Sequence, residues 1–160
     1  MADEICKAHM GKANTMRVKL QEVLEALEGA GMETEYYYDT RRQEVLMVFD
    51  GMINGEDNPK LMEELSDGFI EDFIPLPGQY EINAYRMMEN FIYALPDGNN
   101  KEALFQAIKG KGAFRRFKDR LYNFGMEQIW YAYRDACYEN IAREWCEKHG
   151  IIIEGEKHHD

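Results

Sequence analysis

The chain has 160 residues, of which 30 are Asp or Glu and 19 are Lys or Arg, for a formal net charge of −11. This acidic excess argues against general electrostatic binding to nucleic acid or anionic lipid, but it is compatible with a local basic site. No apolar run approaches the roughly 20 residues of a membrane span, and the N-terminus lacks the apolar core of a signal peptide. With 45% hydrophobic residues, a folded cytoplasmic protein is expected.

The first half of the chain predicts a helix, a hairpin, a second helix and a third strand. Residues 1–15 show no sustained period and are expected to form a flexible extension. Apolar residues recur at helical spacing from Met16 onward, and Gly29 and Gly31 supply a helix end. The later elements are a β-hairpin in "METEYYYDTRRQEVLMVFDG" (32–51), a helix with Asn58 as N-cap and Pro59 in its first turn, and a strand in "FIEDFIPLP" (69–77).

The second half predicts four helices and a short last strand. The long fourth helix, which ends at Gly150, carries apolar residues around much of its circumference and is expected to be central and largely buried. The earlier three are expected in "EINAYRMMENFIYALP" (81–96), in "NNKEALFQAIKG" (99–110) with Asn99 or Asn100 as cap, and in "GAFRRFKDRLYNFG" (112–125), and the strand is expected in "IIIE" (151–154).

This order of elements indicates an α+β fold. A small antiparallel sheet, made of the hairpin plus the third strand, is expected to pack with a C-terminal bundle of about four helices. We expect a single domain over residues 16–154 and a flexible tail over residues 155–160.

One stretch of this acidic chain is basic, because seven basic and two acidic residues lie between Lys101 and Arg120. On a helical wheel, the arc that contains Phe117 and Leu121, together with Phe114 and Phe124, is expected to be core. Glycines precede this helix, and a helix N-terminus beside glycines exposes backbone N–H groups that suit a phosphate or carboxylate. The candidate anion-binding or nucleic-acid-binding residues are Lys109, Gly110, Lys111, Gly112, Arg115, Arg116, Lys118 and Arg120.

The same stretch also has a purely structural interpretation. Gly110 would end the preceding helix, Gly112 would permit a tight corner, and the basic side chains would pair with the chain's own acids. The pattern "GKG" is not a phosphate-binding loop. The orientation of Arg115, Arg116 and Lys118 separates the two interpretations, because only side chains that face open solvent are available to a ligand.

A second candidate surface is the tyrosine-rich hairpin. Tyr36, Tyr37 and Tyr38 alternate in direction if they lie on a strand. Either one side of the hairpin exposes tyrosine, or another element covers it. An exposed tyrosine face would suit a protein–protein adaptor, which is the alternative function that the sequence allows.

Metal and catalytic patterns are weak in this chain. Two C-x-x-H pairs, Cys6/His9 and Cys146/His149, could form a zinc set, but neither has the surroundings of a zinc knuckle, so no metal and no cofactor is expected. Cys137 and Cys146 are expected to lie too far apart on one helix for a disulfide. A third hypothesis is a small-molecule enzyme that uses carboxylates and Arg134, but no catalytic residue can be named and an enzyme is not expected.

Three stretches in order resemble a bacterial family of small cytoplasmic proteins that is known only as a serial-numbered uncharacterised family. They are "FIPLPGQYEINAYRMMENFI", "AIKGKGAFRRFKDRLYNFG" and "WYAYRDACYENIAREWCEKHGI", and "VLEALEGAG" with the hairpin is similar to its N-terminal part. The resemblance covers about residues 18–153 and leaves out both ends of the chain. It implies no activity, ligand or catalytic residue. The family's hairpin turn holds a Gly where this chain has "TRRQE".

The basic stretch therefore predicts a non-enzymatic binding protein, of otherwise unknown function, that accepts an anion at this surface. The expected anion is nucleic-acid phosphate or an acidic protein partner. No membrane partner is expected, and the sequence does not indicate an oligomeric state.

Overall fold

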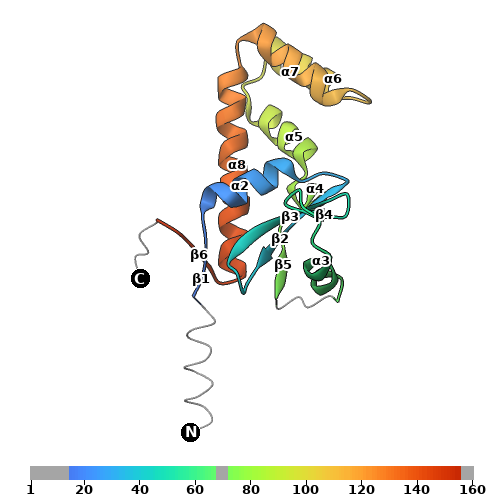
Figure 1. Cartoon of the computed structure of the whole chain (residues 1–160). Helices are drawn as coiled ribbons and strands as arrows, with labels where there is room; N and C mark the ends of the chain where they lie inside the picture. Colours follow the sequence, from blue (N-terminus) through green and yellow to red (C-terminus); the bar gives the residue numbers. More distant parts are fainter. Residues whose placement is uncertain (1–14, 68–71, 156–160) are drawn as a thin grey trace. The chain divides into compact units, whose positions relative to one another are not determined.

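The computed structural model describes residues 15–67 and 72–155 of the chain (Figure 1). It has the predicted α+β fold, and it divides into two compact units. The first unit runs to Ile82 and resumes at Asn140, and the second is Asn83–Glu139. Whether both units form the single domain expected over residues 16–154 stays a prediction. The expected flexible ends, 1–15 and 155–160, fall almost wholly outside the described residues.

The first unit is built on a four-stranded antiparallel sheet, which confirms the predicted hairpin and third strand. Its strand order is β4 (Met52–Ile53), β3 (Glu44–Phe49), β2 (Thr34–Asp39) and β5 (Phe73–Pro75). The buried Asp39 carboxylate holds the hairpin turn, since it accepts hydrogen bonds from the backbone N–H groups of Arg41 and Arg42 and from the Arg42 guanidinium. Gln43 has a φ of 55°, so this turn places a glutamine in the left-handed region that glycine usually occupies.

Both faces of this sheet are covered, which decides the alternatives left open for the three tyrosines. On one face, α3 (Pro59–Ser66) covers a core of Leu46, Ile53, Leu61 and Phe73, against which Tyr37 packs. On the other face, Tyr38 is fully buried and meets Trp145 edge to face, with ring centroids 6.3 Å apart. Tyr36 and Tyr37 are half-buried. The hairpin therefore lacks the exposed tyrosine surface on which the adaptor hypothesis rested.

The predicted cap of α3 is confirmed, and the predicted start of the first helix is wrong. The Asn58 side chain accepts a hydrogen bond from the Leu61 N–H, and Pro59 opens the helix. The first described helix, α2 (Leu20–Gly29), begins four residues after Met16. Met16–Val18 instead forms strand β1, which pairs in parallel with β6 (Ile151–Ile153), the expected last strand. Local periodicity could not indicate this because the pairing partner lies at the opposite end of the chain.

The second unit contains four helical segments, as the predicted bundle requires. They are α5 (Ala84–Ala94), α6 (Asn99–Ala107), α7 (Ala113–Phe124) and the first part of α8 (Glu127–Lys148). Phe91, Phe117 and Trp130 meet edge to face at its centre, with ring centroids 4.9 to 6.1 Å apart. This aromatic cluster joins α5, α7 and α8.

Two helix boundaries and one burial prediction need correction. The expected helix 81–96 is interrupted at Asn83, which separates α4 (Gln79–Ile82) from α5 and adopts a left-handed conformation with a φ of 47°. The α6 cap is Gly98, and Asn99 is already helical. The long helix α8 is not largely buried. Ile129 and Tyr131 are exposed, and only a few residues of the helix are buried in either unit. No described helix is long and apolar enough to cross a bilayer.

Candidate functional site

The corner between α6 and α7 is held by Arg116. Its guanidinium donates to the carbonyl of Ala107 at 2.8 Å and to the carbonyls of Lys109 and Lys111. Ala107 is the last residue of α6, and Lys109 and Lys111 follow it. Carbonyls at a helix end are otherwise left without helical partners. Arg116 therefore acts as a clamp on its own backbone, and anion binding by its guanidinium stays a prediction.

The two glycines of this corner have structural roles. Gly110 and Gly112 both have a φ of 77°, in the left-handed region. A Cβ atom on Gly112 would lie 3.0 Å from the Arg116 Nη1 atom, closer than ordinary van der Waals contact. The tight corner expected at Gly112 is thus present. The other two parts of the structural interpretation differ from the structure, since α6 already ends at Ala107, before Gly110, and Arg116 binds carbonyls and not acids.

The other five candidates face solvent. Lys109, Lys111, Arg115, Lys118 and Arg120 are all exposed, and none forms an ion pair within the part of the chain that the structure describes. The acidic residues of the chain therefore do not neutralise them by direct contact there, contrary to one part of the structural interpretation.

Three side chains of α7 form what we call the basic stripe: Arg115, Lys118 and Tyr122. Their spacing of three and four residues puts them on one helix face, away from the buried Phe117 and Leu121. Tyr122 is 72% exposed, so its ring is open to a ligand. Lys109 and Lys111 precede the stripe on the α6–α7 corner. The predicted core arc is confirmed for Phe117 and Leu121 but not for Phe114, which is 47% exposed at the edge of that arc.

The stripe lies on the unit that has the more positive net charge. Residues 83–139 contain nine Lys or Arg and seven Asp or Glu, whereas the rest of the chain contains ten and twenty-three. The second unit is therefore net basic although the whole protein is acidic. A field of this kind favours approach of an anion to the second unit over the first.

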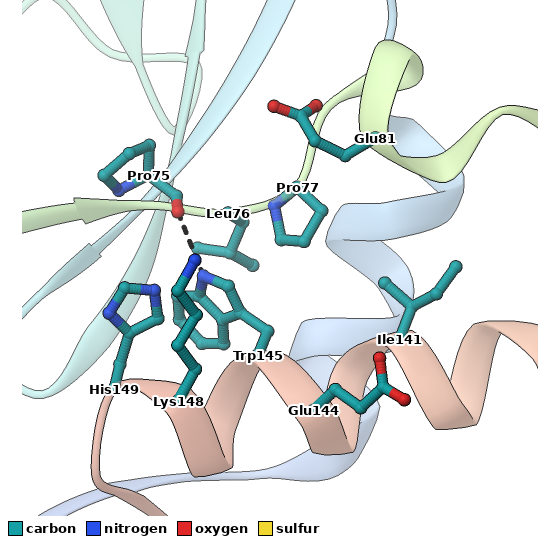
Figure 2. Close-up of a pocket in the computed structure, with 9 residues that line it drawn as sticks. All are labelled: Pro75, Leu76, Pro77, Glu81, Ile141, Glu144, Trp145, Lys148 and His149. Atoms are coloured by element: carbon teal, nitrogen blue, oxygen red, sulfur yellow. Dashed lines mark hydrogen bonds between the residues drawn. The ribbon is translucent and has the colours of Figure 1, made fainter.

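The first unit contains a feature that the sequence did not predict, which we call the Trp145 groove. It has a volume of about 470 Å³ and lies between the chain that leaves β5 and the C-terminal half of α8 (Figure 2). The Trp145 indole N–H donates to the Pro75 carbonyl at 3.0 Å and so joins the two walls. Its lining residues are Pro75, Leu76, Pro77, Glu81, Ile141, Glu144, Trp145, Lys148 and His149.

Four ionisable side chains line this groove. Glu81 and Glu144 contribute carboxylates from α4 and α8, and Lys148 and His149 lie at the end of α8 (Figure 2). One Glu81 oxygen accepts a hydrogen bond from the Gly78 N–H at 2.8 Å. Burial, and secondarily the Lys148 ammonium, lower the pKa of His149 below its ordinary value of 6.5. The imidazole is therefore neutral at pH 7.

The metal and catalytic hypotheses gain nothing from this geometry. Cys6 and His9 lie outside the described residues, and among the described ones no three His, Cys, Asp or Glu side chains come together as a metal site would require. Neither Cys137 nor Cys146 forms a disulfide within the described residues. Arg134 is half-buried with its guanidinium over the Tyr138 ring, 4.9 Å from the centroid.

The fold and these features define a small α+β protein with an exposed basic helix face and a separate groove of ligand size. A family model for the uncharacterised protein family UPF0158 matches residues 13–158, and the chain belongs to this family. The match reaches further in both directions than residues 18–153, and so includes most of the tail that the resemblance left out. Searches of the curated proteins and of the solved structures each found no match.

Proposed function

We propose that this protein binds single-stranded nucleic acid through the basic stripe of α7. The observation that carries the proposal is that Arg115 and Lys118 are exposed, form no ion pair in the described chain, and share a helix face with the exposed Tyr122. Cationic side chains contact phosphates, and an aromatic ring beside them provides a surface on which a base stacks.

Tyr122 favours nucleic acid over an acidic protein and favours single strands over a duplex. An acidic protein needs only the cations, whereas an exposed tyrosine adds a stacking contact that only an unpaired base can use. In a duplex the bases are stacked on one another, so the ring would gain nothing. Lys109 and Lys111, next to the stripe on the corner, extend the line of positive charge.

The acidic charge of the whole protein sets the expected strength of binding. The first unit repels a polyanion at long range, and salt weakens both this repulsion and the attraction of the stripe for phosphates. We expect weak, strongly salt-dependent binding that a cell could use only at high local nucleic-acid concentration. The proposal includes a cytoplasmic location, where cysteines outside disulfides, such as Cys137 and Cys146, stay reduced.

The test is fluorescence anisotropy with a labelled oligouridine at low salt. Replacing Lys111, Arg115 and Lys118 with Ala is expected to lower affinity at least about tenfold and to reduce the salt slope by about one for each phosphate that the protein no longer neutralises. Arg116 is kept, because its removal would disturb the corner. The control replaces Arg17, Lys19 and Lys60 with Ala, three exposed cations of the first unit, and makes the same change in net charge.

A second variant tests the stacking interaction. Tyr122→Ala is expected to weaken binding of the single strand by about tenfold and to leave binding of a duplex of the same length unchanged. Failure of the parent protein to bind the oligouridine at low salt would refute the proposal. Equal decreases in affinity in the stripe variant and the Arg17/Lys19/Lys60 control would refute it too, because they would show a general charge effect.

A further inference from the structure

We propose that the Trp145 groove binds a small zwitterion with one carboxylate and two positive groups on an aliphatic body, the chemistry of a basic amino acid. This inference is independent of nucleic-acid binding, since all the lining residues belong to the first unit and the basic stripe belongs to the second. It stands on the volume of the groove, its apolar walls and the arrangement of its charges.

The walls suit an aliphatic body of limited size. Leu76 and Pro77 come from the chain that leaves β5, and Ile141 and Trp145 come from α8 (Figure 2). The Trp145 N–H is already used by the Pro75 carbonyl, so Trp145 presents apolar surface to the groove. A volume of about 470 Å³ is within the usual range of small-molecule sites, which combine apolar walls with a few fixed polar groups.

The charged side chains of the groove complement the charges of such a ligand. Glu81 and Glu144 are negative, Lys148 is positive, and His149 is neutral at pH 7 because its pKa is lowered. A molecule with two cationic groups and one carboxylate therefore balances every charge in the groove. Glu81 keeps one oxygen free of its bond to the Gly78 N–H, and that oxygen can accept from a ligand.

Glu144 and Lys148 are also kept apart. They are four residues apart on α8, with the acid nearer the N-terminus, which is the spacing and order that most favours an ion pair on a helix. No such pair forms in the described structure. In Figure 2 the Lys148 side chain extends toward Pro75 and Trp145, while Glu144 points away from it beside Ile141. Both charged groups thus remain open to a ligand that spans them.

The probe is L-arginine, and the readout is the pair of tryptophan indole N–H signals in a proton–nitrogen correlation spectrum. The signal of Trp145 is expected to shift saturably with a Kd of about 1 mM, a reasonable affinity for so small a ligand. The Trp130 signal is an internal control, because that residue lies in the aromatic cluster of the second unit. Absence of a saturable Trp145 shift at about twenty times that concentration would overturn the proposal.

Substitutions at three exposed residues of α8 then test the role of each charged group. Lys148→Gln is expected to weaken binding of L-arginine about tenfold but to leave binding of agmatine, which lacks the carboxylate, unchanged. Glu144→Gln is expected to weaken both ligands. Glu147→Gln is the matched control, since Glu147 is exposed on the same helix but does not line the groove. Equal effects of Glu144→Gln and Glu147→Gln, or weaker agmatine binding in Lys148→Gln, would overturn the assignment.

A last probe distinguishes a free amino acid from the basic C-terminal residue of a peptide. N-acetyl-L-arginine keeps the guanidinium and the carboxylate but lacks the second cation. It is expected to bind several-fold more weakly than L-arginine, because either Glu81 or Glu144 is then left without a partner. Equal binding of the two compounds would contradict the requirement for two positive groups.

Discussion

Arg115 and Arg116 are adjacent arginines whose side chains have different partners. Arg115 faces solvent on the basic stripe, while the Arg116 guanidinium binds the carbonyls of Ala107, Lys109 and Lys111. The sequence indicated a basic stretch, but it could not indicate which arginine was committed to the backbone. Which arginine binds the backbone depends on the course of the chain between α6 and α7. The left-handed conformations of Gly110 and Gly112 turn that chain back toward Arg116.

We therefore expect substitution of Arg116 to affect the stability of the fold, and substitution of Arg115 to affect ligand binding but not stability. Arg116→Ala should lower the free energy of unfolding by about 1–2 kcal/mol, because several carbonyls lose a charged donor. Arg115→Ala should change it by less than about 0.5 kcal/mol, as for an ordinary surface position. Urea unfolding followed by circular dichroism measures both. Arg116→Lys is the control that keeps the charge without the planar fork, and a fully stable Arg116→Ala protein would disprove the clamp.

The second prediction at the residue scale concerns pH. Burial lowers the pKa of His149 below 6.5 in the folded protein, so the unfolded chain binds a proton more readily than the folded one. Stability contributed by the neutral imidazole is therefore present above about pH 6.5 and is lost as the pH falls below it. In urea unfolding at pH 7.5 and pH 5.5, the parent should lose more stability on acidification than His149→Gln. Identical decreases in the two proteins would contradict the lowered pKa.

At the scale of elements, local signals predicted most of the fold, and the errors share a cause. The hairpin, α3 with its Asn58 cap, and α7 between glycines all follow from residues that lie next to one another in the chain. The errors at Met16–Val18 and at Asn83 arose where a distant partner or a single left-handed residue overrides the helical period. The Trp145 groove was missed for the same reason, since Pro75 and Trp145 are 70 residues apart.

Asn83 offers a direct test of the break between α4 and α5. Its side chain accepts a hydrogen bond from the Arg86 N–H, and its φ of 47° is unfavourable for most residues. Asn83→Ala should cost about 2 kcal/mol, because it removes the cap and strains the backbone. Asn83→Gly should cost less than about 1 kcal/mol, since glycine adopts this conformation freely. Chemical denaturation measures both, and equal costs would show that the left-handed conformation is not required.

At the scale of the whole molecule, the dominant feature is the uneven charge of the two units. The sequence could predict a basic region, because counting charges needs no structure. It could not predict which basic residues belong to the exposed stripe, because that depends on which side chains bind the protein's own backbone. The surplus of acids belongs entirely to the part of the chain outside the second unit. That surplus should oppose folding through self-repulsion.

This predicts opposite effects of salt on stability and on binding. Raising NaCl from about 0.05 to 0.5 M shortens the range of charge interactions severalfold, so the melting temperature should rise by about 2–4 °C, equivalent to about 1 kcal/mol for a chain of this size. Oligouridine binding should weaken over the same range. Differential scanning calorimetry in NaCl and in KCl provides the measurement and its control. A melting temperature that fell with salt would mean that ion pairs such as Arg41–Glu64 outweigh the repulsion.

The parallel pairing of β1 with β6 has a consequence for the architecture of the chain. Met16 lies beside Ile151 and Val18 beside Ile153, so the start of β1 and the end of β6 are separated by only about the length of a three-residue strand, roughly 10 Å. A short linker could join these two points, and new termini could then be opened in an exposed turn elsewhere. A circularly permuted version of the chain should therefore retain the same sheet and groove.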